Sequence, residues 1–251
     1  MELGRASFWV LLLAGWALLA RMGPWPRYLL PGPQQVASSL WTMAADGRLA
    51  PALARSLMRL AQGYGLAAGL GIPLGVALAR SETLRATLRP LVQGLQALPS
   101  ICWLPLALLW FGLSEAAIVF VVVMGSLLAI SIATEDGVLG IPPQLLRVSG
   151  TLGIRGPRFL FGVLLPAALP GILTGLKLGF SFAWRALMAG ELLFVSGGLG
   201  QQLTTGRELL DVAQVMAVMV AIVVVGMTID RWVFGLLEAH VRRRWGLVET
   251  G

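Results

Sequence analysis

Six long apolar segments constrain this chain more than any other feature of its sequence. They cover residues 8–20, 57–79, 91–111, 116–133, 172–194 and 212–234. Five of them fall within the roughly 17–25 residues that a helix needs to cross a membrane. Only 12% of the residues are charged, whereas soluble domains carry about 25%. The sequence therefore predicts an all-α integral membrane protein, with residues 1–251 forming a single domain of six transmembrane helices.

The first apolar segment is short, and it could also be a signal peptide. Arg5 precedes its apolar core, but the residues after it, Leu18-Leu19-Ala20-Arg21, make a poor cleavage site. We therefore expect an uncleaved first helix. In the proline-rich stretch that follows, residues 36–45 could form a short interfacial helix or a solvated loop, and the sequence favours neither.

The basic residues indicate topology rather than nucleic-acid binding. The net charge is +7, but the charges cluster at the ends of the apolar segments instead of on one face. With both termini inside, ten arginines lie on the inner side and six on the outer side. This arrangement predicts N-in, C-in orientation, with a long polar segment, 135–171, in the cytoplasm. The inner set is Arg5, Arg80, Arg85, Arg89, Arg147, Arg155, Arg158, Arg242, Arg243 and Arg244.

Small residues and prolines mark the second and third segments. The pairs Gly65/Gly69, Ala67/Gly71 and Gly71/Gly75 are each four apart, which predicts a smooth face for close helix packing. Pro99 and Pro105 interrupt the third segment. Broken membrane helices are tolerated where the freed carbonyls are buried or line a cavity. The interruption is thus consistent with a pathway wall and with an ordinary proline kink.

Residue types needed for catalysis or metal binding are scarce. One cysteine, Cys102, and one histidine, His240, leave no disulfide, metal-ligand set or catalytic triad. The one lysine, Lys177, is not in a P-loop, so the chain has no P-loop with which to hydrolyse ATP. The doublet Glu135-Asp136 is expected to be solvated.

Three ionisable residues lie in the fifth segment: Lys177, Arg185 and Glu191. Lys177 can extend to the inner interface. An arginine near the bilayer centre costs at least about 2.5–3.5 kcal/mol, so Arg185 should face protein or a wet cavity. It could contact the solute or pair with another helix. Because Arg185 and Glu191 are six residues apart, they lie on different helix faces and should not pair.

The segment from Leu145 to Pro170 is basic and lies between apolar segments. Residues 144–153 can form an amphipathic helix with Leu145, Val148 and Leu152 on one side. Gly153 could supply a left-handed cap, and Pro157 discourages continuation. Such a helix needs a surface, either a partner protein or the inner leaflet.

Short motifs in a fixed order along the chain carry a family resemblance. The chain resembles the permease subunits of binding-protein-dependent ABC importers, in the branch of nitrate, sulfonate and taurine permeases. The motifs are Leu30-Pro31-Gly32-Pro33, Arg55-Ser56-Leu57 through Gly71-Ile72-Pro73-Leu74-Gly75, Pro99 with Leu104-Pro105-Leu106, Trp110-Phe111-Gly112, Leu152-Gly153, 163–172, Gly175-Leu176-Lys177, Ala183-Trp184, Gly190-Glu191 and Gly198-Leu199-Gly200.

The resemblance implies a cytoplasmic coupling helix that inserts into a groove of an ATPase subunit. The family's signature glycine and Leu-Pro match Gly153 and Leu165-Pro166, but its Glu-Ala-Ala reads Arg147-Val148-Ser149 here. The charge is therefore reversed at the first position. The implied coupling residues are Arg147, Val148, Ser149, Leu152, Gly153 and Arg155, and the expected pathway residues are Pro105, Ser181, Arg185 and Glu191.

The resemblance also implies the partners. They are a cytoplasmic ATPase dimer that binds ATP and Mg²⁺, a second permease copy, an external solute-binding protein and the lipid of a bacterial inner membrane. This chain itself would bind no cofactor and catalyse no reaction. The branch favours small anions such as sulfonates, taurine, nitrate or bicarbonate. The alternatives are a heterocyclic vitamin precursor as solute, or an autonomous secondary transporter.

Overall fold

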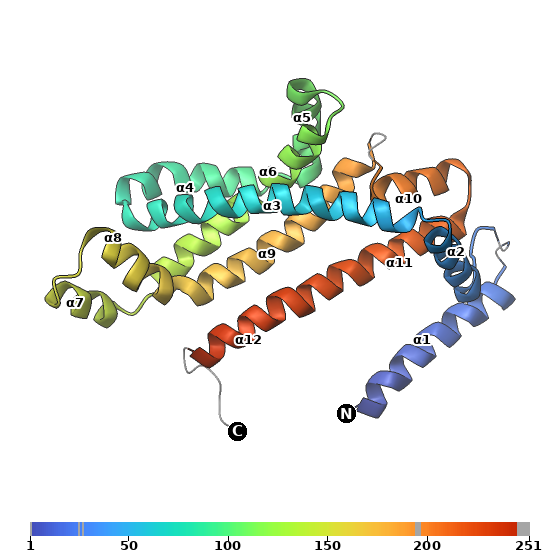
Figure 1. The fold of residues 1–251 in the computed structure, drawn as a ribbon, viewed down its shortest axis with the longest axis horizontal. Coiled ribbons are helices and arrows are strands. Elements are labelled where there is room, and N and C mark those ends of the chain that lie inside the picture. Colours follow the sequence, from blue (N-terminus) through green and yellow to red (C-terminus); the bar gives the residue numbers. More distant parts are fainter. Residues whose placement is uncertain (1, 25, 27, 194–196, 245–251) are drawn as a thin grey trace. The chain divides into compact units, whose positions relative to one another are not determined.

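The computed structural model describes residues 2–24, 26, 28–193 and 197–244, and their regular structure is helical (Figure 1). The all-α prediction is confirmed for these residues. In chain order the helices are α1 Glu2–Met22, α2 Pro33–Ala45, α3 Leu49–Arg80, α4 Glu82–Gln96, η1 Ser100–Trp103, α5 Leu104–Phe111, α6 Glu115–Leu139, α7 Pro143–Thr151, α8 Gly156–Phe159, η2 Leu160–Leu164, α9 Leu165–Glu191, α10 Leu199–Glu208, α11 Val212–Ile229, η3 Asp230–Phe234 and α12 Gly235–Arg244.

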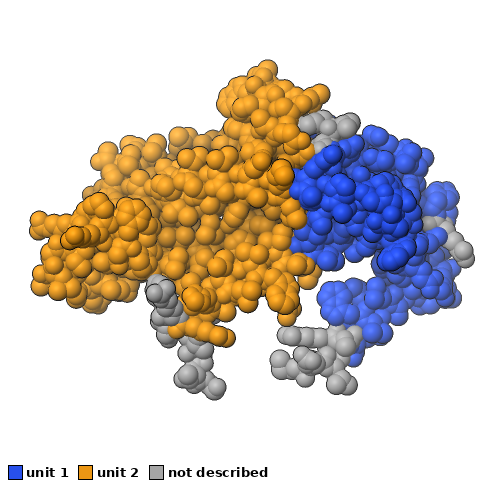
Figure 2. Space-filling model, viewed as in Figure 1, with its two compact units in different colours: residues 1–56, 191–225 blue, residues 57–190, 226–251 orange. Residues whose placement is uncertain are grey.

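The chain forms two compact units (Figure 2). Unit 1 comprises residues 1–56 and 191–225, and unit 2 comprises residues 57–190 and 226–251. Unit 1 holds α1, α2, α10, the start of α3 and most of α11. Unit 2 holds the rest of α3, the helices from α4 to α9 and the C-terminal helix α12, and it contains most of the features described below.

Four helical stretches among the described residues are long and apolar enough to cross a membrane. They are Leu49–Arg80, Glu115–Leu139, Gly156–Glu191 and Val212–Val241. The second, fourth and sixth predicted segments lie inside these stretches. The fifth, 172–194, runs past the end of α9 at Glu191, and its last residue lies outside the described residues. The apolar part of α1, Ser7–Met22, is shorter.

The third predicted segment, 91–111, is not one helix. α4 ends at Gln96, and the following pair η1–α5 is bent away from it by 101°. Pro99 has no amide hydrogen, and it restricts the residue before it to extended conformations. Pro105 instead lies in the first turn of α5, where a missing amide hydrogen costs nothing. With this bent pair counted as one span, the structure has five candidate spans.

The polar segment between the fourth and fifth spans is shorter than the predicted 135–171. α6 continues to Leu139, and the helical stretch that ends at Glu191 already begins at Gly156. α7 ends at Thr151, so this helix does not continue to Pro157, as the sequence predicts; Pro157 lies in the first turn of α8, where it begins the next stretch. The π-turn η2 lies just before Pro166, and π-helical backbone usually occurs as such a single turn inside a longer α-helix. Only α7 and its two flanking turns remain outside the long helices.

Residues 36–45 belong to α2, so the solvated-loop alternative is wrong. Gln35 caps the start of α2, because its side-chain oxygen accepts a hydrogen bond from the Gly32 amide at 3.0 Å. Val36 and Met43 are buried. The indole nitrogen of Trp16 on α1 donates to the Pro31 carbonyl at 3.1 Å, which ties α1 to the turn before α2.

Close packing of α3 against α6 in unit 2 uses only part of the predicted glycine face. A Cβ atom at Gly71 would lie 2.9 Å from the Leu127 carbonyl oxygen, and one at Gly75 would lie 2.6 Å from the Thr134 Cβ. Ala67 is fully buried. By contrast, Gly65 and Gly69 have nothing within 4 Å of such a Cβ. The Ala67/Gly71/Gly75 row is therefore the contact face, and the Gly65/Gly69 pair is not part of it.

Candidate functional site

A cavity of about 380 Å³ lies in unit 2, beside the break between α4 and η1. One wall is the broken stretch itself, residues 95–101, whose backbone leaves the helical hydrogen-bond pattern after Ala97. The other walls come from α6 and α9 and comprise Met124, Gly125, Leu128, Phe182, Arg185 and Ala189. The cavity therefore combines irregular backbone, apolar side chains and one arginine.

Arg185 is held by its own helix. Its Nε atom donates to the Ser181 carbonyl at 3.1 Å, and its guanidinium lies 4.8 Å from the centre of the Phe182 ring. Among the described residues, its two Nη atoms have no hydrogen-bond partner. The side chain is exposed where it lines the cavity. An arginine fixed at Nε and stacked on a ring keeps its remaining donors for a planar anionic group.

The other three predicted pathway residues do not line this cavity. Ser181 is exposed on α9, and its hydroxyl donates to the Lys177 carbonyl at 3.3 Å. Pro105 is exposed at the start of α5. Glu191 is fully buried in a different environment. Of the four, the structure places Arg185 alone at the cavity.

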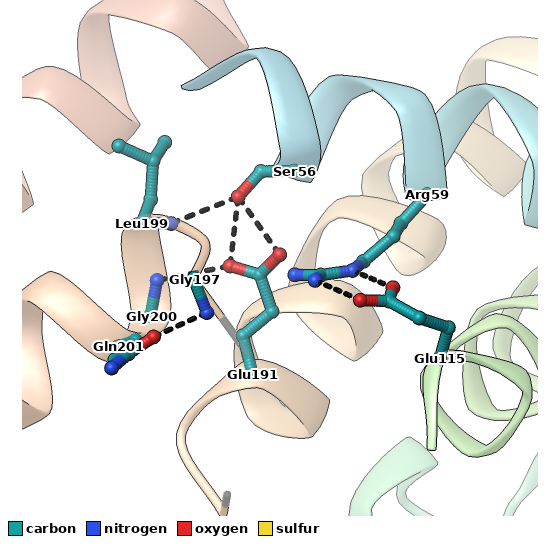
Figure 3. A network of polar contacts seen from close by, with 8 residues as sticks. All are labelled: Ser56, Arg59, Glu115, Glu191, Gly197, Leu199, Gly200 and Gln201. Carbon is teal, nitrogen blue, oxygen red and sulfur yellow. Dashed lines mark hydrogen bonds and ion pairs between the residues drawn. The ribbon is translucent and has the colours of Figure 1, made fainter. Parts of the chain in front are cut away.

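Glu191 is the last residue of α9, and its carboxylate is hydrogen-bonded to two other segments of unit 1 (Figure 3). The Ser56 hydroxyl lies 2.8 Å from each carboxylate oxygen, and the Gly200 amide donates to Oε2 at 2.9 Å. The Leu199 amide in turn donates to the Ser56 hydroxyl at 2.9 Å. A carboxylate at the start of α10 is favoured by the unpaired amides and the dipole of that helix. Glu191, the last residue of α9, is therefore a structural tie within unit 1 between the start of α3 and the start of α10.

The glycines after α9 make this tie possible. A Cβ at Gly200 would lie 2.5 Å from the Glu191 Cβ, and one at Gly198 would meet the Glu191 carboxylate. Gly197 has a φ of +70°, which favours glycine, and its amide donates to the Gln201 side chain. The sequence reading missed Ser56 because a lone serine near a span end carries no signal.

An ion pair within unit 2 was also not predicted from the sequence (Figure 3). Arg59 on α3 donates from Nε and Nη2 to the Glu115 carboxylate, the latter at 2.6 Å. The Arg59 side chain is only 3% exposed. The pair ties α3 to the first turn of α6, where a carboxylate also suits the helix dipole.

The doublet Glu135-Asp136 is solvated only in part. Asp136 is 57% exposed and accepts a hydrogen bond from Arg89 on α4 at 3.2 Å. Glu135 is fully buried; its nearest charge is the same arginine, at 3.4 Å, and neither carboxylate oxygen is hydrogen-bonded. The prediction of a solvated Glu135 is wrong, because α3 packs closely against α6 at this position. A Cβ atom at Gly75 would lie 3.0 Å from the Glu135 amide nitrogen.

α7 presents an exposed apolar surface in the connection between α6 and α8. Leu145, Val148 and Leu152 are 47%, 57% and 69% exposed, and Arg147 and Arg155 are exposed beside them. Ser149, by contrast, is buried, and its hydroxyl donates to the Leu146 carbonyl at 2.8 Å.

Gly153 ends α7 as the sequence predicts. Its φ is +70°, and the Ile154 amide donates back to the Ser149 carbonyl at 3.0 Å. This left-handed turn satisfies the last carbonyls of α7. Figure 1 shows α7 as a short helix beside α8.

Comparisons with known proteins agree with this architecture. A putative ABC transporter permease protein of Methanocaldococcus jannaschii is 36% identical over 177 residues, which cover 70% of this chain and 66% of that protein. The taurine transport system permease protein TauC of Escherichia coli is 31% identical, with 87% of this chain and 82% of that protein covered. The nitrate import permease protein NrtB of Synechocystis is 29% identical, with 84% and 80% covered.

A solved structure and a family model complete the comparison. The inward-facing MetNI methionine ABC transporter matches with a TM-score of 0.66 at 20% identity, covering 74% of this chain and 93% of the matched chain; this likeness concerns the fold. The model of the binding-protein-dependent transport system inner membrane component matches residues 71–244. The chain therefore belongs to this family, the permease subunits of ABC importers.

Proposed function

We propose that this chain forms the translocation pathway of an ATP-driven importer for a small anion, such as taurine or another sulfonate, nitrate or bicarbonate. Membership of the permease family supports the importer class, and relatives named for taurine and nitrate support the kind of solute. The single structural observation that carries the anion is Arg185 at the cavity beside the α4–η1 break.

The position of Arg185 suits transient anion binding. Its charge lies in a long apolar helix, where electrostatic interactions are stronger than in water. No carboxylate lies among the residues that line the cavity, so the guanidinium would be the charge that an entering solute meets. Stacking on Phe182 and the bond to the Ser181 carbonyl hold the guanidinium in place before the solute arrives.

Substitution of Arg185 tests this proposal. In vesicles that contain the importer with its ATPase and binding protein, we expect Arg185→Gln to lower anion uptake roughly tenfold or more, since a hydrogen bond to a charged group contributes about 1.5–3 kcal/mol. Arg185→Lys keeps the charge and should retain part of the uptake. Full uptake by Arg185→Gln, with normal assembly, would remove the basis for an anion.

α7 is the proposed contact with the ATPase, which would bind ATP and Mg²⁺. Leu145, Val148 and Leu152 form an apolar surface outside the long helices, and such a surface is stable when a partner buries it. Arg147 is exposed on the same helix. Because it replaces an acidic residue of the family signature, we expect an acidic residue in the facing groove of the partner.

The proposed importer would have two further partners. Two copies of the permease would enclose one pathway, and an external binding protein would deliver the solute near residues 197–200, at the start of α10. The arginine distribution supports a topology in which both termini and α7 would lie on the cytoplasmic side of an inner membrane. Glu191 would then fix the start of α10 on the outer side, since its carboxylate contacts the Gly200 amide and the Ser56 hydroxyl, and this hydroxyl accepts from the Leu199 amide.

A further inference from the structure

The turn between α10 and α11, in unit 1, holds a leucine in a conformation that favours glycine. Among the described residues, Leu210 is the one residue other than glycine with a positive φ, at +55°. Its amide donates to the Arg207 carbonyl at 3.1 Å, and the Asp211 amide donates to the Gly206 carbonyl at 2.9 Å. These bonds form a Schellman motif. Leucine is disfavoured at its left-handed position because the Cβ atom approaches the following carbonyl oxygen.

Two other helices of this chain end in the same motif, and both have glycine at the equivalent position. After α2 it is Gly47, and after α7 it is Gly153, each with a φ of +70°. Leu210 gains little burial in exchange for its strain, since it is 82% exposed, and its neighbour Leu209 is 69% exposed. A leucine that strains the backbone and packs against little of its own chain indicates a contact outside the chain.

The position of the turn favours the lipid bilayer as that contact. α11 begins directly after it, at Val212, and has no charged residue as far as Ile229. These 18 residues extend over about 27 Å, close to the roughly 30 Å of the hydrocarbon core of a bilayer. They are also the first part of a candidate span. Leu209 and Leu210 therefore lie at the surface of the bilayer, next to its apolar core.

Tyr28 lies near the two leucines. All three line a cavity of about 420 Å³ in unit 1, together with Gln35 and Asp211 among other residues. Tyr28 is 69% exposed. Tyrosine is enriched where a bilayer meets water, because its ring is apolar and its hydroxyl is polar. This surface of unit 1 thus combines apolar side chains with polar groups, as a contact with the membrane interface requires.

We propose that Leu209, Leu210 and Tyr28 insert into the interfacial region of the lipid bilayer and hold the start of α11 at that depth. The turn is fixed to α11, because the Asp211 carboxylate accepts a hydrogen bond from the Gln214 amide at 2.9 Å. Burial of Leu210 in lipid would offset the strain of its backbone. In the topology proposed above this is the outer leaflet, but the contact is the same on either side of the membrane.

Spin labels test the depth of the turn. The chain has one cysteine, Cys102, so Leu210→Cys in a Cys102→Ser background carries a single nitroxide. The full chain is placed in nanodiscs of phosphatidylethanolamine and phosphatidylglycerol. Collisions of the nitroxide with oxygen, which enters lipid, are then compared with collisions with a water-soluble nickel complex. We expect oxygen to dominate severalfold at Leu210→Cys. Glu208→Cys, on an exposed polar residue of α10, should show the reverse.

Leu209→Cys replaces Leu210→Cys if the latter fails to fold, and we expect oxygen to dominate there too. Dominant nickel collisions at the leucine position, or the same ratio as at Glu208→Cys, overturns the inference. The turn would then face water, where a protein partner could cover it. The measurement needs neither ATPase nor solute, so its failure would leave the proposed anion importer untouched.

Discussion

Glu191 and Arg185 look alike in the sequence, as two charged residues of one apolar helix. Their roles diverge because of partners far away along the chain. Ser56, which binds Glu191, is 135 positions distant, and nothing in the local sequence connects the two. Arg185 has no such partner among the described residues and lines a cavity instead. The sequence predicts that both side chains need a polar environment, but only the fold decides which kind.

Glu191→Ala should destabilise the protein. It removes the acceptor for Ser56 and for the Gly200 amide in a fully buried site, at a cost of about 2–3 kcal/mol. For a chain of this size that corresponds to a fall of roughly 5–10 °C in the midpoint of thermal unfolding. Glu208→Ala, on an exposed residue of α10, serves as the control. Equal midpoints for the two variants would show that Glu191 does not tie these helices.

The environment of Glu135 also depends on a contact that lies far away along the chain. A Glu-Asp doublet near the end of a span reads as solvated, and Asp136 is. Glu135 is buried because α3 approaches α6 closely at Gly75, a contact between positions sixty residues apart. Its carboxylate keeps only the neighbouring charge of Arg89.

At the scale of the helices, spacing patterns predict packing faces but not which of two overlapping faces is used. The small residues of α3 lie four apart on two different sides. The structure places Ala67, Gly71 and Gly75 against α6, whereas Gly65 and Gly69 face open space within unit 2. The sequence cannot separate them, because both rows consist of small residues four apart.

Two glycine substitutions test this assignment. Gly75→Ala would bring a Cβ against the Ser131 carbonyl and the Thr134 side chain, and we expect a loss of about 1–3 kcal/mol, as for overpacking in a core. Gly69→Ala meets nothing within 4 Å and should be neutral or slightly stabilising, since alanine favours helix more than glycine does. Thermal unfolding of both variants in the same detergent is the measurement. If Gly75→Ala is as stable as Gly69→Ala, the assigned face is wrong.

Prolines illustrate what the sequence predicts about helix ends. Pro99 is predicted to interrupt the third span, and it lies in the break that forms one wall of the Arg185 cavity. Pro105 was also expected to interrupt a helix, yet it lies in the first turn of α5. Pro157, expected to discourage continuation of the helix over 144–153, lies beyond the end of α7 and in the first turn of α8. A proline disrupts a helix from within and favours its beginning. Its effect therefore depends on where the preceding helix ends, which tertiary packing decides.

At the scale of the whole molecule, the order of motifs along the chain carried the family assignment, and the family model confirms it. The chain itself supplies helices, a cavity with one arginine and an exposed α7, but it has no P-loop. In the proposed importer, a separate ATPase subunit would supply the energy. The central claim is therefore that α7 binds an ATPase.

Affinity purification of the tagged chain from its native membranes, with mass spectrometry of the proteins that accompany it, tests this claim most directly. We expect a stoichiometric P-loop ATPase with the wild-type chain and with Arg158→Glu, which reverses an exposed charge on α8. Arg147→Glu, on α7, should recover severalfold less of it. A wild-type chain that purifies alone after gentle crosslinking would contradict the account and indicate an autonomous transporter, and equal recovery with Arg147→Glu would remove Arg147 from the contact.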